Sequence, residues 1–147
     1  MNHPDKRIVD FINEHHVLTL ATCTENNAWC AHCYYVWLKV ENCFVFTSGA
    51  ESKHVQDVNV NPKVAGSVVL ETSIVGKVQG IQFRGTMEIP DNELATKAKI
   101  AYYKKFPLAV ALKTTLWVVH TDYIKMTDNL LGFGKNLIWE CGEKSKN

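Results

Sequence analysis

The chain has no excess of charge of one sign and no long apolar run. Its 16 lysine and arginine residues face 15 aspartate and glutamate residues, a formal net charge of +1 over 147 residues. Charge scattered in this way argues against a nucleic acid or an acidic lipid as the main partner. No stretch approaches the length of a membrane-spanning helix, and residues 1–10 lack the apolar segment of a signal peptide. The sequence therefore predicts a cytoplasmic protein.

The chain also lacks the short motifs of common enzyme chemistries. It has no nucleophile elbow, Walker loop or GxGxxG, its six histidines show no metal-ligand spacing, and no pair of acids suggests hydrolysis. Cys30 and Cys33 have CxxC spacing, but positions three apart on a strand point to opposite faces. No second pair completes a zinc set, and five cysteines without an export signal favour free thiols. If the chain is an enzyme, a bound cofactor must supply the reactivity.

Length and composition fit one domain over residues 1–147, with no repeats, low-complexity segments or linkers. Helices are predicted from Pro4 to about His16, from Asp91 to Lys104, and briefly up to Leu112. The periodicity predicts six strands, at 17–24, 29–39, 43–48, 63–70, 78–89 and 116–127. Six short strands with few intervening helices favour a mainly β fold with flanking helices, a closed antiparallel barrel.

The predicted strand at 29–39 is unusual because both of its faces are largely apolar or aromatic. A strand of a small barrel usually has one buried face and one polar, solvent-exposed face. Since the outer face of this strand is also apolar, it must meet a partner chain or a flat ligand. A homodimer that holds a cofactor at its seam satisfies both requirements.

The segment 44–69 reads as strand, turn, short helix and strand, and its middle predicts an anion site. Ser52 stands at the N-cap position of the helix, which an Asn-Pro pair ends. The first backbone N–H groups of such a helix have no helical partner, and the helix dipole makes this end partly positive. Lys53 and His54 add a cation and a donor at the same place. The predicted ligand of this site is a phosphate. The alternative is that the segment is an ordinary capped surface helix that binds no ligand.

These pieces and the strand order resemble the pyridoxamine 5'-phosphate oxidase-like FMN-binding split barrels, over roughly residues 5 to 140. The resemblance is carried by Thr47, Ser48, Ser52, Lys53 and the Asn-Pro-Lys-Val-Ala run at 61–65. Residues 29–31, 80–85 and 127–139, the last with Gly132-Phe133-Gly134-Lys135, are similar to a small uncharacterised bacterial subgroup. The pyridoxal-binding Trp-x-Arg-x-His segment of the oxidase has no counterpart in 116–139, so a typical pyridoxamine phosphate oxidase is not expected.

The resemblance implies an FMN-binding, six-stranded antiparallel split β-barrel that acts as a homodimeric oxidoreductase. The small-molecule substrate is unknown, and NAD(P)H is a possible electron donor. A non-catalytic flavin-binding or stress-related module and a heme- or deazaflavin-binding split barrel remain alternatives. The strands at 29–39 and 43–48 lead toward the predicted phosphate site, so the flavin ring is expected beside that site. The resemblance adds Gln82, Trp117 and Lys135, the last two from the partner chain. The expected cofactor-binding residues are His32, Cys33, Tyr34, Phe46, Thr47, Ser48, Ser52, Lys53, His54, Gln82, Trp117 and Lys135.

Overall fold

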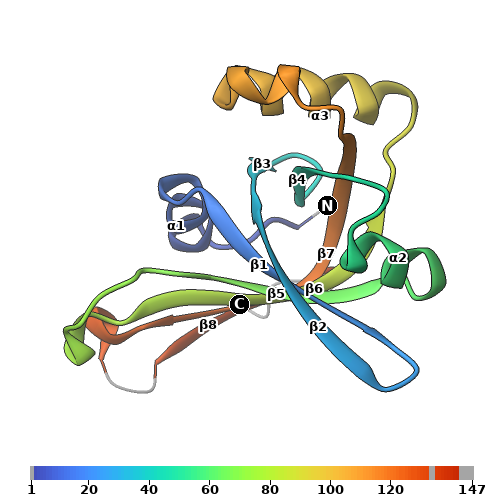
Figure 1. Cartoon of the computed structure of the whole chain (residues 1–147). Coiled ribbons are helices and arrows are strands. Elements are labelled where there is room, and N and C mark those ends of the chain that lie inside the picture. The colour runs from blue at the N-terminus through green and yellow to red at the C-terminus, as the bar shows by residue number, and fades with distance from the viewer. Residues whose placement is uncertain (1, 133–134, 143–147) are drawn as a thin grey trace.

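The computed structural model describes residues 2–132 and 135–142, and these residues form one curled antiparallel sheet flanked by helices (Figure 1). Phe133 and Gly134 of the predicted C-terminal motif lie outside the described residues. The strands of the described residues are β1 (Val17–Thr24), β2 (Asn27–Tyr34), β3 (Val36–Leu38), β4 (Cys43–Ser48), β5 (Lys63–Val69), β6 (Gln79–Glu88), β7 (Thr115–Asp128) and β8 (Asn136–Glu140). They follow the order β2-β1-β5-β6-β7-β4-β3, and β8 pairs with β7.

The sheet curls because one stretch of chain contributes both of its ends. β2 is the first strand in the sheet order and β3 is the last, yet only Tyr35 separates them along the chain. Tyr35 is fully buried, its backbone N–H donates to the carbonyl of His16, and its hydroxyl donates to the carbonyl of Ile12 at 2.6 Å. The predicted antiparallel split barrel is therefore confirmed.

The predicted strand count of six is wrong. The described part of the chain forms eight strands, or seven if β2 and β3 are counted as one run interrupted at Tyr35. The predicted strand at 29–39 breaks there because Tyr35 turns into the core instead of continuing the ladder. The additional strand is β8, in a region for which the sequence predicts no strand. Its register against β7, with Trp139 opposite Ile124, buries one face of a segment too short to show a clear alternation.

Helices cover the outside and the open ends of the sheet. They are α1 (Lys6–Glu14), α2 (Lys53–Val60) and α3 (Asn92–Lys105), with 3₁₀ turns η1 (Val75–Lys77), η2 (Pro107–Ala111) and η3 (Asn129–Leu131). Asp5 caps α1 by accepting the backbone N–H of Arg7, and Asp91 stands at the N-cap position of α3, where the sequence predicts these helices to begin. Figure 1 shows α3 crossing one end of the barrel, with α1 and α2 on opposite sides. Among the described residues, no helix is both long and apolar enough to cross a membrane.

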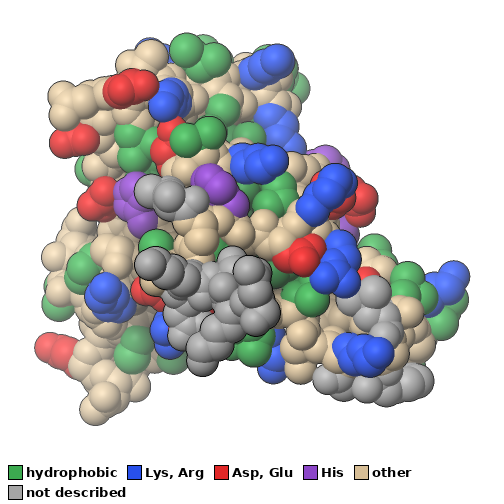
Figure 2. Space-filling view, turned by 180° about the vertical axis from the view of Figure 1, so that it is seen from behind, with side chains coloured by type: hydrophobic (Ala, Val, Ile, Leu, Met, Phe, Trp, Pro, Cys, Tyr) green, Lys and Arg blue, Asp and Glu red, His purple; other side chains and the backbone are tan. Residues whose placement is uncertain are grey.

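The interior is tightly packed around aromatic side chains. Phe44 is fully buried and its ring centroid lies 4.5 Å from that of Phe83. Gly66 on β5 lies against the same ring, since a Cβ at this position would come within 2.3 Å of the Phe83 side chain. The close approach of β5 to this ring therefore requires glycine. On the face seen from behind, basic and acidic side chains are interspersed (Figure 2), in keeping with the near-zero net charge.

Candidate functional site

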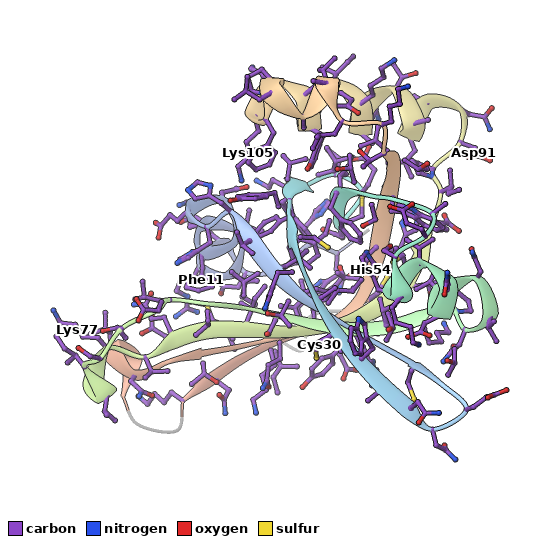
Figure 3. All side chains as sticks on the ribbon, viewed as in Figure 1. Phe11, Cys30, His54, Lys77, Asp91 and Lys105 are labelled. Atoms are coloured by element: carbon purple, nitrogen blue, oxygen red, sulfur yellow. The ribbon has the colours of Figure 1, made fainter. Side chains whose placement is uncertain are left out.

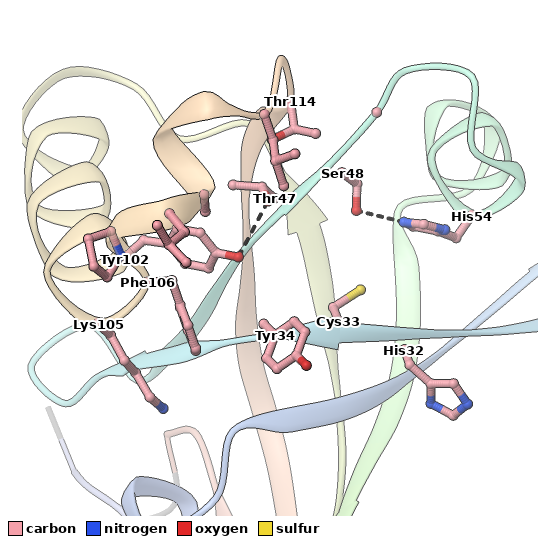
Figure 4. Close-up of a pocket in the computed structure, with 15 residues that line it drawn as sticks. His32, Cys33, Tyr34, Thr47, Ser48, His54, Tyr102, Lys105, Phe106 and Thr114 are labelled. Carbon is pink, nitrogen blue, oxygen red and sulfur yellow. Dashed lines mark hydrogen bonds between the residues drawn. The ribbon is translucent and has the colours of Figure 1, made fainter.

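A pocket of about 850 Å³ lies between the barrel and α3, beside the start of α2 (Figure 4). β2, β4, α2, α3 and η2 all contribute side chains to it. Its lining residues are His32, Cys33, Tyr34, Thr47, Ser48, Gly49, His54, Tyr102, Lys105, Phe106, Pro107, Leu108, Ala109, Leu112 and Thr114. The volume falls in the range of about 300–1,000 Å³ that is typical of small-molecule and cofactor sites.

One end of the pocket is polar and centres on His54. The Ser48 hydroxyl lies 2.7 Å from Nε2 of His54 (Figure 4), and Ser48 also interacts with the Cys33 thiol. Burial lowers the pKa of His54, an effect that the charge of Asp57 partly offsets. Burial also raises the pKa of the Cys33 thiol to about 11, although the hydrogen bond to Ser48 lowers it. At neutral pH this end of the pocket therefore presents a neutral imidazole, a hydroxyl and a protonated thiol.

The start of α2 lies beside this polar end. Ser52 occupies the N-cap position, as predicted, but its side chain makes no capping hydrogen bond to the helix. Its hydroxyl instead donates to the carbonyl of Gly49 at 2.7 Å and lies 3.5 Å from Nε2 of His54. The N–H groups of the first turn of α2 thus donate no hydrogen bond to the Ser52 side chain, which suits this end to an anion.

Lys53 contacts a carboxylate within its own helix. Its ammonium forms an ion pair with Asp57, whose side chain is almost completely buried. The same carboxylate accepts the hydroxyl of Thr22 at 2.8 Å and that of Thr24 at 3.1 Å. These hydrogen bonds, the one from Lys53 foremost, hold the pKa of Asp57 below its usual range. The cluster fastens α2 to β1, and Lys53 is not among the residues that line the pocket.

The other end of the pocket is apolar and aromatic. The ring of Phe106 lies 5.5 Å from that of Tyr34 and 5.1 Å from that of Tyr102. Figure 3 shows Lys105 below α3, on the side that faces the barrel. Its ammonium donates to the carbonyls of His15 at 3.1 Å and Tyr35 at 3.0 Å, and burial lowers its pKa. The Lys105 side chain therefore ties α3 to the point where β2 passes into β3.

Hydroxyl groups lie between these two ends. The hydroxyl of Tyr102 is 3.4 Å from that of Thr47, and burial raises the pKa of Tyr102 (Figure 4). The hydroxyl oxygen of Thr114 is buried and has no hydrogen-bond partner among the described residues. A buried polar atom of this kind is usually paired, but because this oxygen is closed to solvent, a ligand in the pocket does not reach it.

The pocket brings together half of the predicted cofactor residues: His32, Cys33, Tyr34, Thr47, Ser48 and His54. They come from three predicted elements, which confirms that the ends of β2 and β4 lie beside the start of α2. Ser52 borders the same space through His54 and Gly49.

The remaining predicted residues lie elsewhere within this protomer. Phe46 is fully buried and pairs across the sheet with Trp117, which is also in the core. Gln82 is exposed on β6, and Lys135 lies on the surface beside Arg7. With Lys53 held by its carboxylate partner, these residues make no contact with the pocket. Their contacts with a cofactor remain predictions. Two of these residues, Trp117 and Lys135, are predicted to reach the cofactor of the partner chain.

Comparison with known proteins identifies the family. The family model described as pyridoxamine 5'-phosphate oxidase matches residues 4–127. The chain belongs to the pyridoxamine 5'-phosphate oxidase family. A UPF0306 protein of Photorhabdus laumondii is 38% identical over 130 residues, which cover 88% of this chain and 91% of that protein. The predicted family membership is thereby confirmed.

Solved structures of the same fold are named for binding different cofactors. A heme binding protein from Mycobacterium smegmatis superposes with a TM-score of 0.72 and 18% identity. The alignment covers 85% of this chain but only 52% of that protein, so this chain spans about half its length. An FAD-binding protein from Mesorhizobium loti gives a TM-score of 0.65 and 12% identity, with 80% of this chain and 89% of that one covered. Similarity at this level of identity establishes the shared fold.

The contribution of α3 and η2 to the pocket was not predicted. Tyr102 on α3 is buried, and its hydroxyl faces Thr47. The signal that could have found this wall is the apolar run after Phe106. Leu108 is 89% exposed there and Leu112 is 59% exposed, although polar residues would be usual at such exposed positions.

Proposed function

We propose that this chain is an FMN-binding oxidoreductase that acts on a small molecule. The observation that carries the proposal is that one pocket joins a polar end at Ser48 and His54 to an aromatic end at Tyr34 and Phe106. FMN has the same division, with a phosphate at one end and a flat, largely apolar ring system at the other. Membership of the pyridoxamine 5'-phosphate oxidase family supports a flavin, as does the FAD-binding neighbour of the same fold.

The described residues fit the two parts of FMN. Ser48, Ser52, His54 and the first turn of α2 would hold the phosphate, because they present hydroxyl, imidazole and backbone donors at one point. The aromatic wall at Tyr34 and Phe106 suits a flat ring system, and the hydroxyls of Thr47 and Tyr102 lie between it and the polar end. A flavin held here supplies hydride and electron transfer, while the chain binds it, orients it and excludes water.

We further propose that the active form is a homodimer. The outward side of β2 leaves Cys30, His32 and Tyr34 exposed, with Tyr34 61% exposed. Ala65 continues this exposed face on β5, and His32 and Tyr34 also line the pocket. A second copy seated on this face would cover it and close the cofactor site at the seam. Sedimentation at micromolar concentration should show a dimer that Ala65→Arg dissociates, with Ala50→Arg as a matched exposed control, and a wild-type monomer would contradict the proposal.

Titration with FMN, followed by quenching of flavin fluorescence, tests the cofactor. Ser48→Ala should weaken FMN binding about three- to tenfold, the value of one lost hydrogen bond, while Ser73→Ala in an exposed loop should leave it unchanged. Anaerobic addition of NADH or NADPH should then bleach the bound flavin. Binding without bleaching by either nicotinamide would indicate a non-catalytic flavin-binding module, and absence of FMN binding would refute the proposal.

Heme is a second candidate because His32 and His54 both line the pocket and imidazole is a common axial ligand of heme iron. The Mycobacterium smegmatis neighbour that is named as heme binding has the same fold. Reconstitution with hemin separates the two candidates. A Soret band that is lost in His32→Ala or His54→Ala would favour heme, whereas retention of FMN in competition with hemin would favour the flavin.

A further inference from the structure

The aromatic end of the pocket contains one cationic side chain and no carboxylate to offset it. Lys105 is the only lysine or arginine among the described residues that line the pocket, and none of these residues is an aspartate or glutamate. In Figure 4 the Lys105 ammonium lies near Phe106 and points away from Ser48 and His54. The pocket therefore has a positive charge at its aromatic end that is separate from its polar, proposed phosphate-binding end.

The backbone holds this ammonium in a fixed place. It donates to the carbonyls of His15 and Tyr35 at 3.1 and 3.0 Å. It also lies 5.1 Å from the centroid of the Tyr35 ring and 5.3 Å from that of Phe106. Hydrogen bonds to carbonyl oxygens favour the charged form of a lysine, although burial opposes it by lowering the pKa of Lys105. Carbonyl oxygens orient the charge without neutralising it, and an ammonium with two such bonds keeps a third N–H.

The aromatic wall limits how far this charge can lie from a bound ring. Neighbouring aromatic rings have centroids about 4.5–7 Å apart, so a ring packed against Phe106 would lie within about 12 Å of the ammonium. At that outer distance and an effective dielectric constant of about 20–40, a unit charge shifts an equilibrium that creates a negative charge by about three- to tenfold. The position of Lys105 is thus close enough to affect the electron affinity of the ring.

We propose that Lys105 raises the reduction potential of the bound flavin and so makes it a better hydride acceptor. The proposal rests on the proposed function, because it requires the flavin ring at the aromatic wall. When the nicotinamide gives up a hydride it becomes oxidised. The uncharged ring gains that hydride at N5 and with it one negative charge, which resides on its pyrimidine edge. A fixed cation stabilises this reduced, anionic form more than it stabilises the oxidised form.

Anaerobic redox titration of the FMN-loaded full chain, followed by flavin absorption at pH 7.5, tests the proposal. Lys105→Gln removes the charge but keeps a side-chain N–H group for the carbonyls. It should shift the equilibrium toward the oxidised form about three- to tenfold, which lowers the midpoint potential of a two-electron couple by about 15–30 mV. Lys105→Arg keeps the charge and should retain the parent potential. Lys104→Gln loses the same charge at an exposed position of α3, where solvent screens it, and should also retain that potential.

Three outcomes would overturn the proposal. An unchanged potential in Lys105→Gln would show that the charge does not act on the ring. An equal fall in Lys105→Arg would assign the effect to a displaced α3, and an equal fall in Lys104→Gln would assign it to net charge. Titration of each apoprotein with FMN by fluorescence quenching reports separately on the cofactor. A parent that does not bind FMN refutes the proposed function, whereas a parent that binds FMN with a potential independent of Lys105 refutes this inference alone.

Discussion

FMN affinity should fall as the pH rises, because His54 is the titratable group at the proposed phosphate end of the pocket. Burial holds its pKa below the usual 6.5, so the imidazole of the empty pocket is neutral at neutral pH. A phosphate placed beside Nε2 stabilises the imidazolium and raises this pKa. Binding therefore takes up a proton. The affinity gained is present below the raised pKa of the complex and is lost as the pH rises through it.

The size of the effect follows from the contact. A hydrogen bond to a charged group contributes about 1.5–3 kcal/mol, which corresponds to about ten- to a hundredfold in affinity. Because pH 6.5 already lies above the lowered pKa of the empty pocket, only part of this gain is present there, and FMN should bind several-fold to about tenfold more weakly at pH 8.5 than at pH 6.5. The second ionisation of a phosphate monoester lies near pH 6, so the ligand stays mostly dianionic across this window. Riboflavin, which lacks the phosphate, should show no such dependence.

Other groups that face His54 titrate outside this range. Burial raises the pKa of Cys33 to about 11, and hydrogen bonds lower that of Asp57 below its ordinary acidic value. His54→Gln should therefore bind FMN with an affinity that is weak and independent of pH, and His54→Lys should restore tight binding across the window. Fluorescence titrations at pH 6.5, 7.5 and 8.5 measure both. A pH dependence that persists in His54→Gln, or that riboflavin shares, would refute the reasoning.

Three further expectations test the fold around the pocket. Gly66→Ala should destabilise the protein by about 1–3 kcal/mol in denaturant unfolding, because its Cβ would overlap the neighbouring aromatic ring, while Gly76→Ala has open space and should be neutral. Cys141 is exposed and should react rapidly with a thiol reagent at pH 8, whereas buried Cys33 should react only on unfolding, and equal rates would show that the pocket opens. Asp57→Asn should lower the thermal midpoint because asparagine accepts poorly from three donors, and an unchanged midpoint would show that the cluster is dispensable.

The fold could be predicted because its signals are local. Alternation from Ile81 to Ile89 predicted β6, and helical spacing with an aspartate before the first turn predicted α1 and α3. The predicted strands at 17–24 and 29–39 also leave a turn between them, and there Glu25 and Asn26 adopt the positive φ that a two-residue turn requires. The break at Tyr35 was not readable, because it depends on a buried hydroxyl that reaches a carbonyl of α1.

The pocket could be predicted only along one side. The residues at the ends of β2 and β4 and at the start of α2 are close in sequence or joined by hairpins, so connectivity brings them together. Lys53 shows where this reasoning fails. The sequence places a cation at the helix start, but a carboxylate four residues later competes for it. Whether a lysine faces a ligand or its own helix depends on the burial of that carboxylate, which no local pattern reports.

The far wall of the pocket depends on a long-range closure of the chain. α3 begins 44 positions after the end of β4, at Asn92 against Ser48, and it comes over the pocket because its last turn is held where β2 passes into β3. Lys105 makes this connection through the carbonyls of His15 and Tyr35. The break at Tyr35 frees a backbone carbonyl from the ladder, and the lysine satisfies it. The irregularity that closes the barrel therefore also anchors the helix that forms the far wall of the pocket.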